Sequence, residues 1–202
     1  MAQQEIRVGI VGANASAGWA RVSHVPAING LPGVKLAAVA TRNEQSAREA
    51  GKAFGADRWF SDPLAMIRDD LIDVVTIAVK VPEHRELVLA ALDAGKAVYC
   101  EAPLGRNVAE TEEMASAARS LHTAIGLQGR FNPAVRQAAQ LLSSGKIGRP
   151  LHARIVSTNV GFGAEMPSSH EYFNKTWSGA NHRQCGAYAR FGGGSSRSDR
   201  RG

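Results

Sequence analysis

The chain has 202 residues, of which 44% are hydrophobic and 21% charged, ordinary values for a soluble globular protein of one domain or slightly more. No apolar run approaches the roughly 20 residues that span a bilayer, and the N-terminus does not resemble a signal peptide, so we expect no membrane segment. The formal net charge of +6 includes +4 from the residues after Asn181, a basic tail that does not by itself indicate nucleic-acid binding.

The cysteine content predicts a reducing compartment. Cys100 and Cys185 are the only two cysteines, and they stand too far apart in the sequence to suggest a disulfide framework. We therefore expect a cytoplasmic protein.

In chain order, short apolar runs alternate with helix-compatible stretches. Strands are predicted at 6–12, 34–40, 72–79, 96–100 and 122–128, with a short segment near 59–60, and helices at 19–29, 43–55, 62–69, 82–94 and 107–120. Such alternation predicts an α/β fold, a Rossmann doubly wound parallel sheet with helices on both faces.

The pattern changes after Gln128. A helix is predicted at 131–144, followed by an alternating, half-exposed strand at 151–160. From about residue 192 the composition is Gly, Ser, Arg and Asp, which cannot bury a core. We therefore predict a Rossmann domain over 1–128, the incomplete beginning of a second α/β open-sheet domain over 129–180, and an unstructured or out-of-frame tail over 181–202.

A loop of small residues follows the first strand. Gly12 suits a tight turn, and Asn14, where a second glycine is usual, can tolerate a left-handed backbone. Small residues let backbone N–H groups approach a diphosphate at a helix N-terminus. The pattern departs from G-x-G-x-x-G, so a glycine-rich turn without a ligand is the alternative. Its place after the first strand of an alternating pattern favours a dinucleotide.

The second strand ends at Thr41 and Arg42, where an acidic residue would favour NAD. A hydroxyl and a guanidinium could instead hold a 2′-phosphate, which favours NADP. The alternative is that Asn43 caps the next helix and Arg42 is merely solvated.

Four segments, at 8–28, 72–105, 127–148 and the strand that follows, resemble the Gfo/Idh/MocA oxidoreductase family over residues 5–180. The resemblance implies a Rossmann domain followed by an open-sheet α/β domain, hydride transfer between NAD(P) and sugars or polyols, and homo-oligomeric full-length relatives. Within the family, the pattern at 12–20 is similar to the branch of the yeast galactose-pathway repressor, a regulator that keeps the dinucleotide site.

The resemblance also implies a set of cofactor-binding positions and no metal. They are Gly12, Asn14, Ala15, Ser16, Trp19, Thr41, Arg42, Val79, His84 and Glu101. Two have alternatives, since His84 could be an exposed helical histidine and Trp19 a core anchor of the first helix.

Two departures from the family weaken the expectation of catalysis. The family's Glu-Lys-Pro motif reads Glu101-Ala102-Pro103 here, and a methyl group cannot transfer a proton, so we predict no catalytic residue. The family's later His-x-x-Asp pair is missing, although codons for 181–193 read one nucleotide later can encode Gly-His-Thr-Leu-Asp. Three hypotheses remain: a sugar or polyol oxidoreductase, a dinucleotide-binding regulator, and a frameshifted fragment without function.

Overall fold

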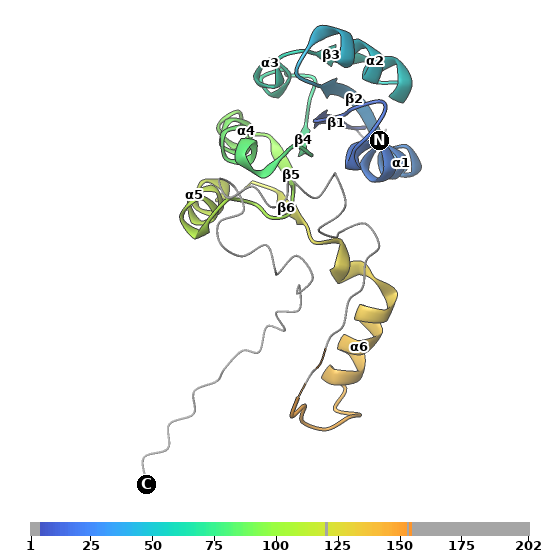
Figure 1. The fold of residues 1–202 in the computed structure, drawn as a ribbon, viewed down its shortest axis with the longest axis vertical. Coiled ribbons are helices and arrows are strands. Elements are labelled where there is room, and N and C mark those ends of the chain that lie inside the picture. Colours follow the sequence, from blue (N-terminus) through green and yellow to red (C-terminus); the bar gives the residue numbers. More distant parts are fainter. Residues whose placement is uncertain (1–4, 120, 153, 155–202) are drawn as a thin grey trace, which may run out of the picture. The chain divides into compact units, whose positions relative to one another are not determined.

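The structure is a computed structural model that describes residues 5–119, 121–152 and 154. The chain divides into two units after Leu127. The first contains a sheet of six parallel strands in the order β3-β2-β1-β4-β5-β6 (Figure 1). The strands are β1 Ile6–Val11, β2 Val34–Ala40, β3 Arg58–Phe60, β4 Val74–Ile77, β5 Ala97–Glu101 and β6 Thr123–Gly126. This order confirms the predicted doubly wound α/β fold.

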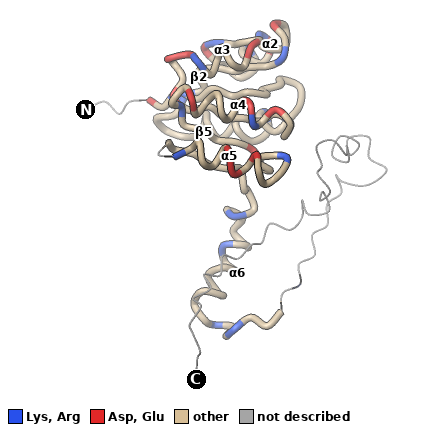
Figure 2. The backbone as a smooth tube through the Cα atoms, turned by 90° about the vertical axis from the view of Figure 1, so that its left-hand side faces the viewer, with Lys and Arg blue, Asp and Glu red and all other residues tan. Residues whose placement is uncertain are grey.

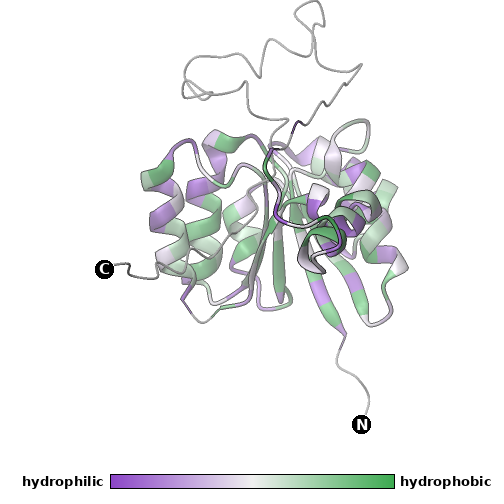
Figure 3. Cartoon of the chain, turned by 90° about the horizontal axis from the view of Figure 1, so that it is seen from below, coloured by the Kyte–Doolittle hydropathy of each residue, from purple (hydrophilic) through white to green (hydrophobic). Residues whose placement is uncertain are grey.

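Helices cover both faces of the sheet. They are η1 Ala20–His24, α1 Val25–Gly30, α2 Glu44–Phe54, α3 Pro63–Ile67, α4 Val81–Asp93 and α5 Val108–Ala118. Figure 1 shows α1 and α2 on one side of the strands, and α3, α4 and α5 on the other. Each side has its own apolar core, one built around Ile10, Val25 and Ile28 and the other around Met66, Val88 and Met114. The centre of the sheet is mostly hydrophobic, with hydrophilic residues towards the outside of the helices (Figure 3).

The first helix differs from the prediction. The helix predicted at 19–29 is found over 20–30, but it begins as the π-helical turn η1 and becomes the α-helix α1 only at Val25. Pro26 has no N–H to donate to the carbonyl of Val22, so a regular α-helix cannot run through this point. The chain accommodates the proline with a wider turn, in which the Val25 N–H donates to the carbonyl of Ala20.

The predicted ends of α2 are confirmed. The side chain of Asn43 accepts a hydrogen bond from the N–H of Ser46 at the N-terminus, and Gly55 adopts φ +69° at the C-terminus. Both are ordinary helix-ending devices, which is why the sequence indicated them. Helix α5 begins in the same way, with the Asn107 side chain accepting from the N–H of Glu110.

The second unit consists, in its described part, of the short 3-10 turn η2 Gln128–Phe131 and the helix α6 Pro133–Ser143. Between 128 and 152 its charged residues are all basic (Figure 2). Leu151, His152 and Arg154 lie in no strand, and the rest of the predicted strand at 151–160 and the tail at 181–202 lie outside the described residues. Within the part described, no helix is long and apolar enough to cross a membrane.

Candidate functional site

The fold gathers the predicted cofactor residues at one edge of the sheet, where the parallel strands end. The glycine loop follows β1, Thr41 and Arg42 follow β2, Val79 follows β4, and Glu101 is the last residue of β5. His84 lies in the first turn of α4, which begins at this same edge. The chain continues from β1 to β2 and β3 on one side and then crosses to β4 on the other side of β1. The carboxyl edge at such a reversal of strand order is the position where doubly wound sheets bind ligands.

Gly12 turns the chain at the end of β1, and no other residue fits there. Its φ is +91°, and a Cβ atom on it would lie 2.5 Å from the carbonyl oxygen of Ala78 and 2.8 Å from Cγ1 of Val79. Side chains are strained at this φ and would also overlap the end of β4. Two predicted cofactor positions, Gly12 and Val79, are therefore in direct contact.

Asn14 orders the loop through its side chain. Its Oδ1 accepts hydrogen bonds from the N–H groups of Ser16, at 2.7 Å, and Ala17, at 3.1 Å. The left-handed backbone considered for Asn14 is not used, because the positive φ angles of the loop belong to Gly12 and Gly18. The carboxamide oxygen thus engages two N–H groups of the loop and holds the loop in one conformation.

Trp19 ends the loop and is 45% exposed. The alternative that it anchors the first helix in the core is therefore wrong. An indole on the surface beside the glycine loop can stack on, or cover, a bound planar group.

At the end of β2, Thr41 and Arg42 have different surroundings. The Thr41 hydroxyl lies 2.6 Å from Oγ of Ser46 and donates to the carbonyl of Asn43 at 3.2 Å, so it already helps to shape the start of α2. The Arg42 side chain is 74% exposed, and its Nη2 lies 3.0 Å from Oε1 of Glu83. Arg42 is therefore accessible to a ligand, while it is also partnered by a carboxylate that the sequence did not indicate.

His84 is 1% exposed, so the alternative of an exposed helical histidine is wrong. Its Nδ1 lies 3.1 Å from the carbonyl oxygen of Pro103 and 3.2 Å from that of Leu104, and its Nε2 lies 3.0 Å from that of Val79. The tautomer decides which nitrogen donates. In either case the ring ties the loop after β5 to the end of β4, and thereby fixes the Glu101-Ala102-Pro103 segment.

The surroundings of Glu101 could not be recognised from the sequence. Nε2 of His24, in η1, lies 2.8 Å from Oε1 of Glu101. The two side chains are only 11% and 14% exposed, and the His24 ring meets Tyr99 edge-on at 5.3 Å between centroids. Burial and the nearby Glu101 charge raise the pKa of Tyr99. Because His24 is remote in the chain, no local pattern points to this contact.

Neither Cys100 nor Lys96, two candidates near Ala102 in the sequence, replaces the missing lysine. Ala102 precedes Pro103 through a cis peptide bond and presents only a methyl group. Burial raises the pKa of the Cys100 thiol to about 12, so it stays protonated and unreactive at neutral pH. Lys96 lies at the opposite end of β5, where it donates to the carbonyls of Asp69 and Ile72.

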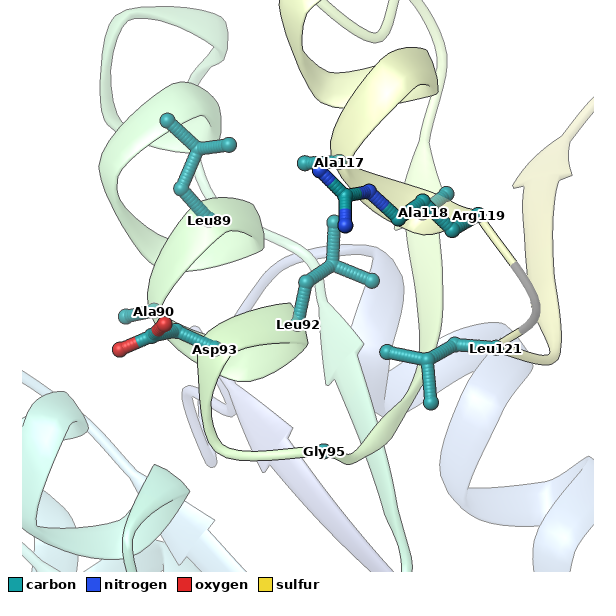
Figure 4. A pocket seen from close by; sticks show the side chains of 9 residues that line it. All are labelled: Leu89, Ala90, Leu92, Asp93, Gly95, Ala117, Ala118, Arg119 and Leu121. Atoms are coloured by element: carbon teal, nitrogen blue, oxygen red, sulfur yellow. The ribbon is translucent and has the colours of Figure 1, made fainter.

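A surface hollow of about 760 Å³ lies away from this edge (Figure 4). It is lined by Leu89, Ala90, Leu92, Asp93, Gly95, Ala117, Ala118, Arg119 and Leu121. These residues come from the ends of α4 and α5 and from the connections that lead into β5 and β6, at the amino end of the sheet. We therefore do not assign the hollow to the dinucleotide. Within the described ranges, no group of three or more His, Cys, Asp or Glu side chains could hold a metal ion.

Comparison with known proteins yields a family match and similar structures. The Gfo/Idh/MocA family model, described as an oxidoreductase family with an NAD-binding Rossmann fold, matches residues 6–128. The chain is 32% identical to the dehydrogenase aclE of Aspergillus oryzae over 182 residues, which cover 85% of this chain and 50% of that protein.

Two solved structures extend the comparison. Levoglucosan dehydrogenase, in complex with NADH and levoglucosan, is 31% identical with a TM-score of 0.67, over 72% of this chain and 41% of that one. A super-repressor mutant of Gal80p from Saccharomyces cerevisiae is 30% identical with a TM-score of 0.66, over 71% and 40%. The chain thus spans half or less of the length of each of these proteins.

Proposed function

Because the chain belongs to the Gfo/Idh/MocA oxidoreductase family, we propose that its first 128 residues bind a nicotinamide dinucleotide along the carboxyl edge of the sheet. The observation that carries this proposal is the turn at Gly12, which has φ +91° and no room for a Cβ, followed by an exposed loop of small residues. Loops of this kind, at this place in the fold, present backbone N–H groups to a diphosphate.

The residues of this edge have distinct roles in the proposal. The loop at Ala15 and Ser16 lies against the diphosphate, and Asn14, which accepts hydrogen bonds from the N–H groups of Ser16 and Ala17, holds the loop in shape before the ligand arrives. Trp19 covers the bound dinucleotide from the loop side. At the other end, His84 fixes the segment after β5, so that Glu101 and Val79 lie beside the nicotinamide half. The nicotinamide itself, when bound, accepts or supplies the hydride.

The proposed reaction of the full-length protein is oxidation or reduction of a sugar or polyol. The substrate class is supported by the levoglucosan bound to the structural neighbour. Hydride transfer from an alcohol needs a group that takes the hydroxyl proton, and Ala102 cannot do so. This chain should therefore bind the cofactor, in the cytoplasm, without ordinary turnover. The likeness to Gal80p and the methyl group of Ala102 favour a second candidate, a dinucleotide-binding regulator or sensor.

We propose further that NADP binds more tightly than NAD. Arg42 supports this preference, since its guanidinium is exposed at the end of β2 and no acidic residue precedes it there. A guanidinium pairs well with a phosphate and gains little from a ribose hydroxyl.

The test is a titration of the purified chain with NADPH and with NADH, in which binding is monitored by tryptophan fluorescence. NADPH should bind more tightly, and Arg42→Ala should remove the difference, whereas Arg48→Ala, on the exposed side of α2, should preserve it. Equal affinities in the unmodified chain would contradict the NADP preference. No affinity for either dinucleotide in a folded protein would contradict the function itself.

The enzyme and the regulator are separated by turnover. A panel of sugars and polyols, incubated with the chain and NADP or NAD, should give no reduced nicotinamide above the protein-free rate. Rapid reduction would instead establish catalysis without the lysine.

A further inference from the structure

We propose that Glu83 sets how strongly the site prefers NADP to NAD, by competing with the 2′-phosphate for Arg42. This inference rests on the proposed function, because it concerns the same dinucleotide site. It adds a specificity residue on α4, outside the glycine loop and the end of β2, where the sequence indicated none.

The contact connects two segments that flank β1. Arg42 follows β2 and Glu83 lies in the first turn of α4, the helix that follows β4. Since β2 and β4 are the two neighbours of β1, the ion pair joins segments that follow the strands on either side of β1. Nη2 of Arg42 and Oε1 of Glu83 are 3.0 Å apart. Oε1 of Glu83 thus engages one donor of the guanidinium that the 2′-phosphate would use, and it places a negative charge beside that guanidinium.

The two cofactors differ in the group that they present to the Arg42–Glu83 pair. NAD has a neutral hydroxyl at the ribose 2′ position, so Arg42 can stay with Glu83 when NAD binds. NADP carries a phosphate there, and a guanidinium forms strong paired hydrogen bonds with either a carboxylate or a phosphate. A 2′-phosphate at Arg42 therefore competes with Glu83 for the guanidinium, and the Glu83 carboxylate then lies near a second anion. Glu83 therefore weakens NADP binding and leaves NAD binding nearly unchanged.

The size of the effect follows from exposure. The Arg42 and Glu83 side chains are 74% and 42% exposed, and ion pairs in such positions are worth no more than about 1 kcal/mol. Removing the competitor should therefore tighten NADP binding by about two- to fivefold. The gain should shrink at high salt, because solvent-exposed charges are screened.

Glu83 also has a structural role that a test must separate. A carboxylate in the first turn of a helix interacts favourably with the helix dipole, so its loss can lower stability slightly. Such a loss would affect both cofactors alike. The ratio of the two dissociation constants is therefore the informative quantity.

The experiment compares the full chain with Glu83→Gln, measuring the dissociation constants of NADP and NAD at low salt. The control is Glu86→Gln, which removes an exposed carboxylate from the same helix. Glu83→Gln should raise the NADP preference two- to fivefold, and Glu86→Gln should leave the ratio unchanged. Thermal unfolding of each variant verifies that it is folded.

Combination with Arg42→Ala tests the route of the effect. If Glu83 acts by occupying Arg42, then Glu83→Gln should change NADP affinity far less in the Arg42→Ala background. An unchanged NADP to NAD ratio in Glu83→Gln, or an effect that persists at full size without Arg42, would overturn the inference and leave the proposed function intact. A folded wild-type chain that binds neither dinucleotide would overturn both.

Discussion

The two ends of the sheet are built in different ways. At the amino end, charged side chains connect neighbouring segments, with Arg7 paired to Asp73 at 2.7 Å and Lys96 donating to the carbonyls of Asp69 and Ile72. At the carboxyl end, the glycine loop is exposed and held by its own Asn14. On the β5 side of this edge, the buried His84 ties the loop after β5 to the end of β4.

The difference separates stability from ligand binding. The described contacts at the amino end hold strands and helices together. The carboxyl end keeps most of the glycine loop, Trp19 and Arg42 exposed. Variants at the amino end should therefore change stability alone, and variants at the carboxyl end should change affinity as well.

The largest effect is expected for Gly12→Ala. The methyl group would be strained at φ +91° and would overlap the carbonyl of Ala78, which together cost about 3 kcal/mol or more. Denaturant unfolding should show the loss, and dinucleotide binding should disappear. The control is Gly18→Ala, where φ is +98° but no atom lies within 4 Å, so only about 1–2 kcal/mol should be lost. Equal losses in the two variants would contradict the close contact with β4.

A smaller loss is expected for His84→Ala. The change leaves the carbonyl groups of Val79 and Pro103 without their buried partner and creates a cavity, which should lower the free energy of unfolding by about 2–4 kcal/mol. Dinucleotide affinity should also fall, because the segment containing Glu101 is no longer fixed. His122→Ala, on an exposed histidine, should change neither quantity. Full affinity in a destabilised His84→Ala protein would show that this loop does not shape the site.

The smallest effect, at the amino end, is expected for Asp73→Asn. The hydrogen bond from Arg7 holds the pKa of the Asp73 carboxyl below its ordinary value of about 3.9. The stabilisation is thus fully present above about pH 4 and is lost as the pH falls through the lowered native pKa. At pH 7 the variant should melt at most about 5 °C below the wild type, a gap that closes on acidification. Its cofactor affinity should be unchanged, and a loss of affinity would contradict the separation of the two ends.

Local signals in the sequence predicted most of the fold. The strand at 34–40 is found with its predicted ends, and Asn43 and Gly55 end α2 as expected, because caps and apolar runs act over a few residues. The strand predicted at 72–79 is shorter, as β4 covers Val74–Ile77. The flanking Asp73 and Ala78 still donate backbone hydrogen bonds to the carbonyls of Arg7 and Val11. The apolar run therefore marked residues that bond to β1 on both sides of the assigned strand.

The candidate site could be predicted only in part. Gly12 and the strand ends follow from the alternation of strands and helices. The contacts that decide what the site can do join distant segments: Arg42 with Glu83, His24 with Glu101, and His84 with the loop after β5. None leaves a pattern at one place in the chain, since each depends on how η1 or α4 packs against the sheet.

The reactivity of the Cys100 thiol can report how often the folded chain opens around β5. A thiol with a pKa of about 12 scarcely reacts with alkylating reagents near neutrality, whereas the same thiol in an opened chain, with an ordinary pKa near 8.5, does so readily. In a Cys185→Ser background, the rate of alkylation thus measures how often β5 becomes accessible. Because Glu101 and Ala102 come next in the chain, a ligand that protects this strand would slow the labelling without any need for turnover.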